Sequence, residues 1–389
     1  MSGKIAITGL GVVSAAGGNV EASLRTLRSG TRPNCIPSPF SSLPASLPTF
    51  AAPGGPNVDR TFYLAMQAAG QALADAGLNP VPIGCRLGVC LGTTVACQLN
   101  DIPFYAEYRA TGNPSMGPVD RFALGSLSER VARELGVDGP ILTVVNACSS
   151  GTDAMGVAMS WLNAGLCDAV LAGGADELSP IPTVGFHALG LISPEPCKPF
   201  DRTRRGLNLG EGAGVVVLER TENAARRGRK SNLFAAGFGA ASDGYHLTAP
   251  HPEGLGLETA IRSALREAGI EPADIDFVNA HGTSTLENDR IEGAVLGRIF
   301  GGDVRVVSTK GSTGHALGAA GGIETVFTAL SLREGWISPN VGFSERDEAI
   351  PFAPLTAIAP VVRRHALSTS LAFGGNNAAL ILSRSEKSA

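Results

Sequence analysis

The feature that most constrains the fold is an internal repeat with a period of roughly 190 residues. Ala72-Leu-Ala-Asp-Ala-Gly-Leu-Asn-Pro80 precedes an apolar run that ends Leu91-Gly-Thr-Thr94. Ala264-Leu-Arg-Glu-Ala-Gly-Ile-Glu-Pro272 precedes a second run, which ends His281-Gly-Thr-Ser284. Each copy reads as a helix, the glycine that ends it, a proline and a buried strand.

A weaker correspondence follows each copy. An apolar run at 141–147 enters Cys148-Ser-Ser-Gly151, and another at 304–308 enters Lys310-Gly-Ser-Thr-Gly314; a small-residue helix is expected after both. The distance in sequence between these two features is shorter than the period of the repeat, which indicates an insertion in the first half. The shared order favours duplication over chance similarity. We therefore predict an N-terminal half at 1–230 and a C-terminal half at 231–389, with a site at their junction.

Short apolar runs bounded by Gly, Asp and Asn alternate with alanine-rich helical stretches. This pattern predicts an α/β fold with strands covered on both faces. With 44% hydrophobic and 17% charged residues, the chain can bury a large core.

Cys148 ends one of these runs and begins a small-residue helix. A thiol there lies near the positive end of the helix dipole, which favours the thiolate and predicts a lowered pKa. Backbone N–H groups at such a turn can also hold an oxyanion. Cysteines among apolar residues are more often core packing, and we interpret the other six that way.

His281 and His315 both follow predicted strands at glycine-flanked turns. Each alone is more often a structural histidine, but with Cys148 they form a candidate Cys/His/His site. Arg204 and Arg205 are candidates for contacting a phosphopantetheine or an acidic carrier protein.

Several other classes of protein fit the sequence poorly. The net charge of −4 gives no bulk reason to bind nucleic acid. No uncharged apolar run approaches the length of a membrane span. The seven cysteines show no CxxC pair or metal spacing, so we expect no metal site, and free thiols favour the cytoplasm over secretion.

Gly9-Leu-Gly-Val-Val-Ser14 is a near-match to a dinucleotide fingerprint. Its third glycine is replaced, and no acidic residue ends a second strand about 20 residues later. A nucleotide-binding oxidoreductase is therefore a weak alternative.

The motifs together resemble one family, and they extend over nearly the whole chain in its order. They are Ile7-Thr-Gly-Leu-Gly-Val-Val-Ser14, Ala147-Cys148-Ser-Ser-Gly151, Lys198-Pro-Phe-Asp201 through Gly214, Ser242 through Pro250, His281-Gly-Thr-Ser-Thr285, Lys310 through Gly321 and Phe373-Gly-Gly-Asn-Asn377. The chain resembles a β-ketoacyl-[acyl-carrier-protein] synthase of the elongating ketosynthase I/II type, in the thiolase superfamily. The resemblance implies the thiolase fold, with duplicated halves in a five-layer α-β-α-β-α arrangement.

The resemblance also implies an activity, an acyltransferase that performs decarboxylative Claisen condensation. Cys148 would take the acyl group from a carrier-protein thioester, and malonyl-acyl carrier protein would extend it to a 3-ketoacyl product. Fatty-acid and polyketide or polyene pathways both use this reaction. The phosphopantetheine arm would come with the carrier protein, so no cofactor of the enzyme is expected.

The implied site roles fall into four groups. His281 and His315 would promote decarboxylation, with Lys310 supporting them and Glu324 holding Lys310. Asp289 and Glu292 would order this region, and Phe373 would act as a gate whose N–H joins that of Cys148 as the oxyanion hole. Thr283, Thr285 and Thr248 would contact the pantetheine arm. Arg204, Arg205 and Arg60 would dock the carrier protein.

The sequence departs from the family pattern in places. Residues 99–118, expected near the acyl pocket and dimer contacts, are divergent, and Ser370-Leu-Ala-Phe373 replaces the usual closing motif. A homodimer, or a heterodimer with a ketosynthase-like subunit, is implied.

Two alternatives share the fold. A non-condensing, chain-length-type partner subunit usually lacks the nucleophilic cysteine, which is present here. A degradative thiolase uses a second cysteine near its C-terminus, and this chain has none after Cys197.

Overall fold

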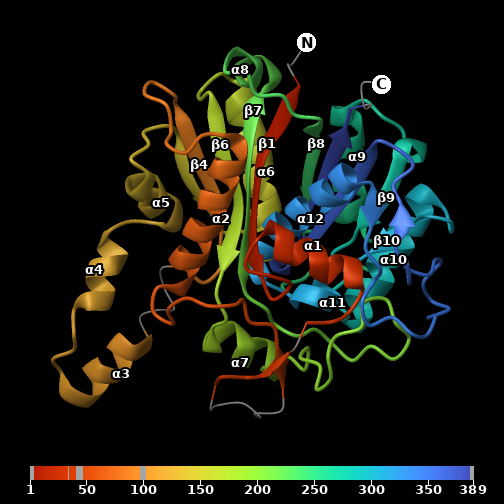
Figure 1. The fold of residues 1–389 in the computed structure, drawn as a ribbon. Coiled ribbons are helices and arrows are strands. Elements are labelled where there is room, and N and C mark those ends of the chain that lie inside the picture. The colour runs from red at the N-terminus through yellow and green to blue at the C-terminus, as the bar shows by residue number, and fades with distance from the viewer. Residues whose placement is uncertain (1–3, 34, 41–46, 97–101, 386–389) are drawn as a thin grey trace.

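The computed structural model describes residues 4–33, 35–40, 47–96 and 102–385, and its main sheet consists of two halves with the same strand order (Figure 1). The first half has the order β5-β4-β6-β7-β1 and the second β10-β9-β13-β14-β8. Both halves pair their first three strands in parallel and the rest antiparallel. This shared topology confirms the predicted duplication.

The strands of the first half are β1 (Ile5–Ser14), β4 (Leu87–Gly92), β5 (Ile141–Val144), β6 (Ala169–Asp176) and β7 (Gly212–Arg220). Those of the second half are β8 (Leu233–Ser242), β9 (Ile275–Asn279), β10 (Val306–Val307), β13 (His365–Ala372) and β14 (Asn376–Arg384). The halves join where Ile5 and Ala6 of β1 pair with Ala235 and Phe234 of β8. The predicted boundary after residue 230 falls just before β8 and stays a prediction.

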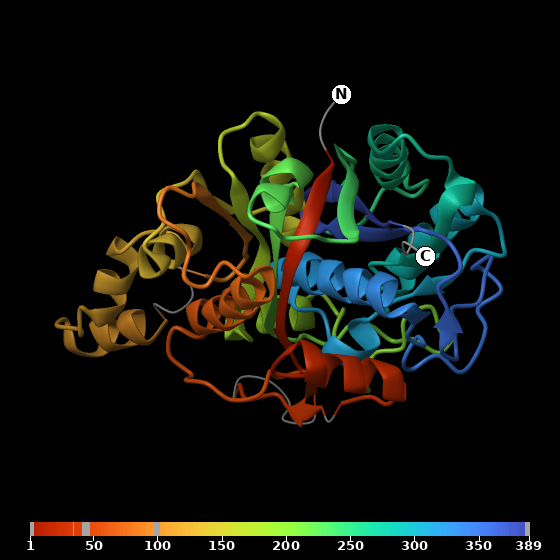
Figure 2. The same cartoon turned by 45° about the horizontal axis from the view of Figure 1, so that its top comes forward.

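Five layers follow from which helices pack on which sheet face (Figures 1 and 2). Helices α6 (Ser150–Asn163) and α12 (Ala320–Glu334) lie between the half-sheets and share one buried apolar cluster. Helix α2 (Arg60–Ala76) covers the outer face of the first half, and α9 (Leu255–Ala268) with α10 (Leu286–Phe300) covers that of the second. Because α12 is buried from Ala320 to Leu332, its apolar residues are distributed around the helix rather than confined to one face.

Glycines let the two central helices approach closely at their N-termini. A Cβ added at Gly151 would lie 2.7 Å from the backbone nitrogen of Gly322, and one at Gly321 would lie 2.7 Å from the backbone nitrogen of Thr152. The approach brings together the turns that precede both helices. These are the turns that carry the candidate site residues.

The remaining elements are shorter or peripheral. They are α1 (Val20–Ser29), β2 (Ile36–Pro37), β3 (Pro48–Thr49), α3 (Ile102–Thr111), α4 (Gly117–Ala123), α5 (Leu127–Leu135), α7 (Pro180–Ala188), α8 (Thr221–Arg226), η2 (Pro272–Asp274), α11 (Lys310–Thr313), η3 (Leu317–Ala319), β11 (Trp336–Ile337), β12 (Ala359–Pro360) and η4 (Phe373–Gly375). Among the described residues, no helix is long and apolar enough to cross a membrane.

Helices α3 and α4 extend from the body of the molecule (Figure 1), and neither has a buried residue. Helix α3 and the first two residues of α4 fall within the divergent segment 99–118, of which residues 99–101 lie outside the described residues.

Candidate active site

Cys148 lies in a constrained turn between β5 and α6. The preceding residue, Ala147, has a φ of +49°, a conformation that is unfavourable for a residue with a Cβ. The Ser150 hydroxyl fixes the turn, because it donates to the Ala147 carbonyl at 2.6 Å and accepts from the Asn146 amide at 2.8 Å. The turn thereby holds the thiol at the start of a helix, as the sequence predicts.

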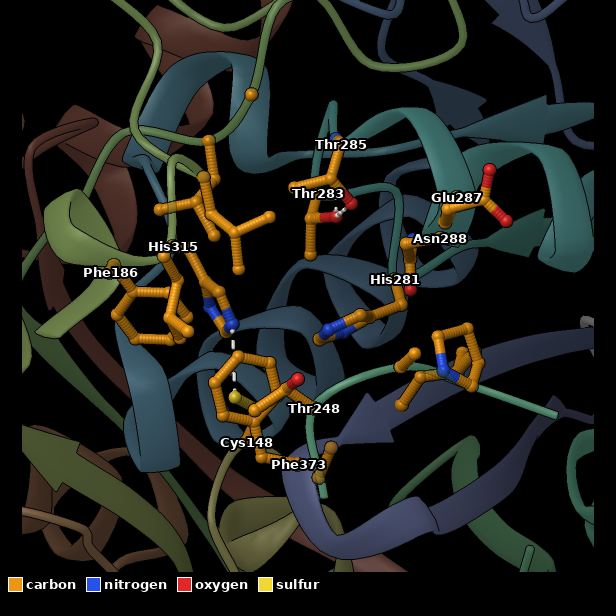
Figure 3. Close-up of a pocket in the computed structure, with 18 of the residues that line it drawn as sticks. Cys148, Phe186, Thr248, His281, Thr283, Thr285, Glu287, Asn288, His315 and Phe373 are labelled. Carbon is orange, nitrogen blue, oxygen red and sulfur yellow. Dashed lines mark hydrogen bonds between the residues drawn. The ribbon is translucent and has the colours of Figure 1, made fainter. Parts of the chain in front are cut away.

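His315 approaches Cys148 from the second half of the chain. Its backbone amide donates to the Asn208 carbonyl at 2.8 Å, and its carbonyl accepts from the Gly210 amide at 3.0 Å. Its Nε2 lies 3.1 Å from the Cys148 sulfur (Figure 3). The nucleophile and a base, separated by 167 residues in sequence, are therefore in direct contact.

His281 is the third member of the cluster. Its ring lies 5.1 Å from that of His315, nearly perpendicular to it, and both face the same space (Figure 3). Lys310 Nζ lies 3.2 Å from His281 Nδ1 and forms an ion pair with Glu324. An ammonium can only donate, so Nδ1 accepts and Nε2 carries the imidazole proton. His281 thus presents a hydrogen-bond donor to the cavity.

Two buried carboxylates hold the turn that carries His281. Glu292 accepts from the backbone amides of His281 and Gly282, each at 2.8 Å. Asp289 accepts from the amides of Ser284 at 3.0 Å and Phe200 at 2.7 Å. Both acidic residues therefore lie where they can order the turn.

The electrostatics of the thiol differ from the sequence prediction. Burial raises the pKa of Cys148 to about 12, and this outweighs the lowering by Lys310 and by a hydrogen bond from the Phe373 amide. The prediction of a lowered pKa is therefore wrong. Burial, followed by the charge of Lys310, holds the pKa of His281 and His315 well below its usual range. The resting site thus pairs a neutral thiol with neutral imidazoles.

A cavity of about 390 Å³ opens onto this cluster. Thr248, Thr283 and Thr285 line it, and the last two bring their hydroxyls within 2.9 Å of each other (Figure 3). Phe373 also lines it, with its ring 5.0 Å from that of Phe186. The threonines and the predicted gate thus share one cavity with the nucleophile. Sequence reasoning missed Phe186, because one phenylalanine in an apolar helix carries no distinguishing signal.

Two of the three arginines predicted to dock the carrier protein have partners within the protein. Arg204 is only 5% exposed and pairs with Asp347 at 2.5 Å, and Arg60 pairs with Glu211 at 2.5 Å. Both guanidinium groups are engaged in these pairs, which does not support the predicted contact with a carrier protein. Arg205 differs, since its side chain is 63% exposed, lines the cavity and lies 3.6 Å from Glu195.

Comparisons with known proteins agree with this geometry. The β-ketoacyl synthase N-terminal domain model matches residues 48–224, and the C-terminal domain model matches 234–344. The chain is 33% identical to 3-oxoacyl-[acyl-carrier-protein] synthase 2 of Coxiella burnetii and 32% identical to that of Staphylococcus aureus (strain COL). Those matches cover 98% of this chain and 98% and 99% of the relatives.

Solved structures show the same similarity. The ishigamide ketosynthase/chain length factor matches with a TM-score of 0.91 and 31% identity, and a β-ketoacyl synthase from Burkholderia phymatum STM815 with 0.90 and 30%. Both alignments cover 99% of this chain and all of the other. The thiolase fold is therefore confirmed, and the chain belongs to the β-ketoacyl synthase family.

Proposed function

We propose that this protein is an acyltransferase that condenses an acyl group on Cys148 with malonyl-acyl carrier protein, with loss of CO₂, to give a 3-ketoacyl-acyl carrier protein. The observation that carries the proposal is the 3.1 Å contact between the Cys148 sulfur and His315 Nε2, beside the donor of His281. A hydrolase needs a route for water, whereas Cys148, His281 and His315 are each no more than 5% exposed. Fatty-acid and polyketide-type biosynthesis are the pathways that use such a product.

The first half-reaction forms the acyl-enzyme. The Cys148 thiol passes its proton to His315 Nε2 as its sulfur attacks the thioester carbonyl of the donor. The amides of Cys148 and Phe373 hold the oxyanion. The carbon–sulfur bond to the carrier then breaks, and the departing thiolate takes the proton from His315. No net proton is released, which suits a thiol whose pKa is raised by burial.

The second half-reaction makes the carbon–carbon bond. The bond between the malonyl α-carbon and its carboxylate breaks and releases CO₂, and the electron pair forms an enolate at the thioester. The Nε2–H of His281 donates to the enolate oxygen, and the imidazole of His315 faces the same space. The α-carbon then attacks the acyl-Cys148 carbonyl, and the Cys148 sulfur leaves as a thiolate. One proton taken up from solvent restores the thiol and balances the carboxylate charge that is lost with CO₂. Lys310 and Glu324 keep His281 in the donor tautomer.

We further propose that acyl carrier protein delivers both substrates. One solved relative, 25% identical, is titled as a polyketide acyl-carrier protein in complex with its ketosynthase. Here the phosphopantetheine arm would enter past Arg205 and contact Thr248, Thr283 and Thr285, which all line the cavity. The arm belongs to the substrate, so the enzyme needs no cofactor of its own for these steps. The free thiols of the six described cysteines support a cytoplasmic site for the reaction.

A second ketosynthase-like subunit would cover the open edge of β5. Leu142 and Val145 at this edge are 43% and 69% exposed, and α3 and α4 expose Tyr105, Tyr108 and Phe122. An apolar edge strand that has no partner on its outer side among the described residues favours association with another chain. Two solved relatives are titled as a ketosynthase with a chain length factor. The alternative, that this chain is itself the non-condensing subunit, is disfavoured by its complete Cys148–His315–His281 cluster.

Intact mass spectrometry tests the proposal. Incubation with acyl-acyl carrier proteins of several chain lengths should add the mass of one acyl group, and peptide mapping should place it on Cys148. Adding malonyl-acyl carrier protein should remove the adduct and yield a 3-ketoacyl carrier protein. Cys148→Ala should give no adduct. If the wild-type protein forms no adduct with any chain length, the condensing role is wrong.

A further inference from the structure

Asp176 is a fully buried carboxylate that has no role in the steps above. It is the last residue of β6 and is 0% exposed. Five donors converge on its two oxygens: the amides of Thr94, Val95 and Gly318, and the hydroxyls of Thr93 and Thr94, at 2.6 to 3.0 Å. Three of these donors are backbone amides, which cannot reverse their roles. Burial raises the pKa of Asp176, and these donors oppose that rise because they stabilise the ionised carboxylate.

Asp176 joins two segments that are distant in sequence. Its Oδ1 accepts from the Val95 amide at 3.0 Å in the turn after β4, and its Oδ2 accepts from the Gly318 amide at 2.7 Å in the turn after His315. Leu317, between His315 and Gly318, has a φ of +49°. A leucine held in that conformation needs its neighbours to be fixed.

The same turn sets the position of His315. On one side, the His315 backbone is bonded to Asn208 and Gly210. On the other side, three residues further along the chain, the Gly318 amide donates a hydrogen bond to Asp176 and fixes the turn that follows His315. We propose that Asp176 is a positioning residue: it holds the His315–Gly318 turn so that His315 Nε2 stays in contact with the Cys148 sulfur. This inference rests on the proposed function and adds to it a residue that touches neither substrate.

The charge of Asp176 gives a second, separable effect. It raises the pKa of Cys148, as Glu324 does, whereas Lys310 lowers it; His281 and His315 also face this thiol. An Asp176→Asn substitution removes that charge and places an amide among five donors. We expect these two changes to affect the alkylation of Cys148 and the condensation reaction in opposite directions. The thiol should ionise more readily, while the loosened turn should displace His315.

Two rates measured on the whole protein test this. In Asp176→Asn, alkylation of Cys148 by iodoacetamide at pH 8, followed by peptide mass, should be threefold faster or more. Condensation should be about 100-fold slower, as expected for a displaced base. Any other combination of the two results overturns the proposal. Alkylation needs no acyl substrate, so it tests Asp176 even if wild-type condensation is never observed, which would instead count against the proposed function.

Two further variants separate charge, position and stability. Gly318→Ala would place a Cβ 2.9 Å from Asp176 Oδ2 and 2.8 Å from the backbone of Thr93, which shifts the turn but keeps the charge. It should slow condensation without speeding alkylation, and it remains informative if Asp176→Asn fails to fold. Condensation at the wild-type rate in this variant overturns the proposal.

Asp201→Asn is the matched control, since Asp201 is also 0% exposed and accepts five hydrogen bonds. It should not speed alkylation, and a rise equal to that in Asp176→Asn overturns the charge effect.

Discussion

The two halves of the molecule use the same turn for different chemistry. In the first half, β5 leads through Cys148 into α6. In the second, β10 leads through Lys310 and His315 into α12. Because the halves pack with these helices side by side, the two turns face one another and meet at the contact between Cys148 and His315. Duplication thus supplied two equivalent positions, and divergence made one a nucleophile and the other a set of basic groups.

The halves also differ at their edges. Strands β5 and β10 occupy equivalent outer positions in the sheet. The edge of β10 is covered by its own chain, since the Leu355 amide donates to the Val306 carbonyl at 2.9 Å and Val306 is 0% exposed. Among the described residues, no strand pairs with the outer side of β5. One edge is therefore covered within the chain, and the other is the edge at which we propose a second subunit.

The largest expected effect comes from breaking the buried ion pair between Lys310 and Glu324, which belongs to the second half. Lys310→Met leaves the buried carboxylate of Glu324 without its cation. The free energy of unfolding should fall by about 3–5 kcal/mol. Urea unfolding measures it, with Ser149→Ala in the first turn, expected to cost about 1 kcal/mol, as the comparison. In the double variant Lys310→Met/Glu324→Gln much of the stability should return while condensation stays lost. Recovery of condensation would contradict the role given to Lys310.

The next effect concerns the two edges. Leu142→Arg on β5 should leave the free energy of unfolding within about 1 kcal/mol of the wild-type value but weaken subunit association at least tenfold, because it places a charge in the exposed apolar edge. Val306→Arg on β10 should cost about 3 kcal/mol or more, because it buries an unpaired charge. Sedimentation velocity and urea unfolding separate the two outcomes. Wild-type association of Leu142→Arg would remove the distinction between the edges.

The smallest effect is a pH dependence in the first half. Burial raises the pKa of Glu177 to about 7. The folded state therefore holds this proton more tightly than the unfolded state. The resulting stabilisation is complete below about pH 4.5 and is lost as the pH rises through 7. Relative to Glu177→Gln, the wild-type protein should lose about 2 kcal/mol of unfolding free energy between pH 5 and 8. Urea unfolding at both values measures this, with Glu195→Gln as an exposed control. A pH-independent difference would show that Glu177 is ionised throughout.

The sequence predicted the features of the site that depend on short stretches of chain. The strand, glycine and helix signals around Cys148, His281 and His315 located three turns, and the repeat indicated that they meet. The sequence could not predict which arginines are buried, because the partner of Arg204 is Asp347, 143 residues away. The raised pKa of Cys148 was missed for a related reason. The helix-start argument is local, whereas the desolvation that outweighs it comes from both halves packed together.

In the proposed mechanism the two halves divide the reaction: the first half carries the acyl group and the second half releases CO₂. The most direct measurement is CO₂ release from malonyl-acyl carrier protein by Cys148→Ala and His281→Ala, alongside acyl-adduct formation by each. Cys148→Ala should form no adduct yet still release CO₂, and His281→Ala should form the adduct but release CO₂ at least 100-fold more slowly than the wild-type protein. If both variants lose CO₂ release equally, or if His281→Ala keeps it, the division between the halves is wrong.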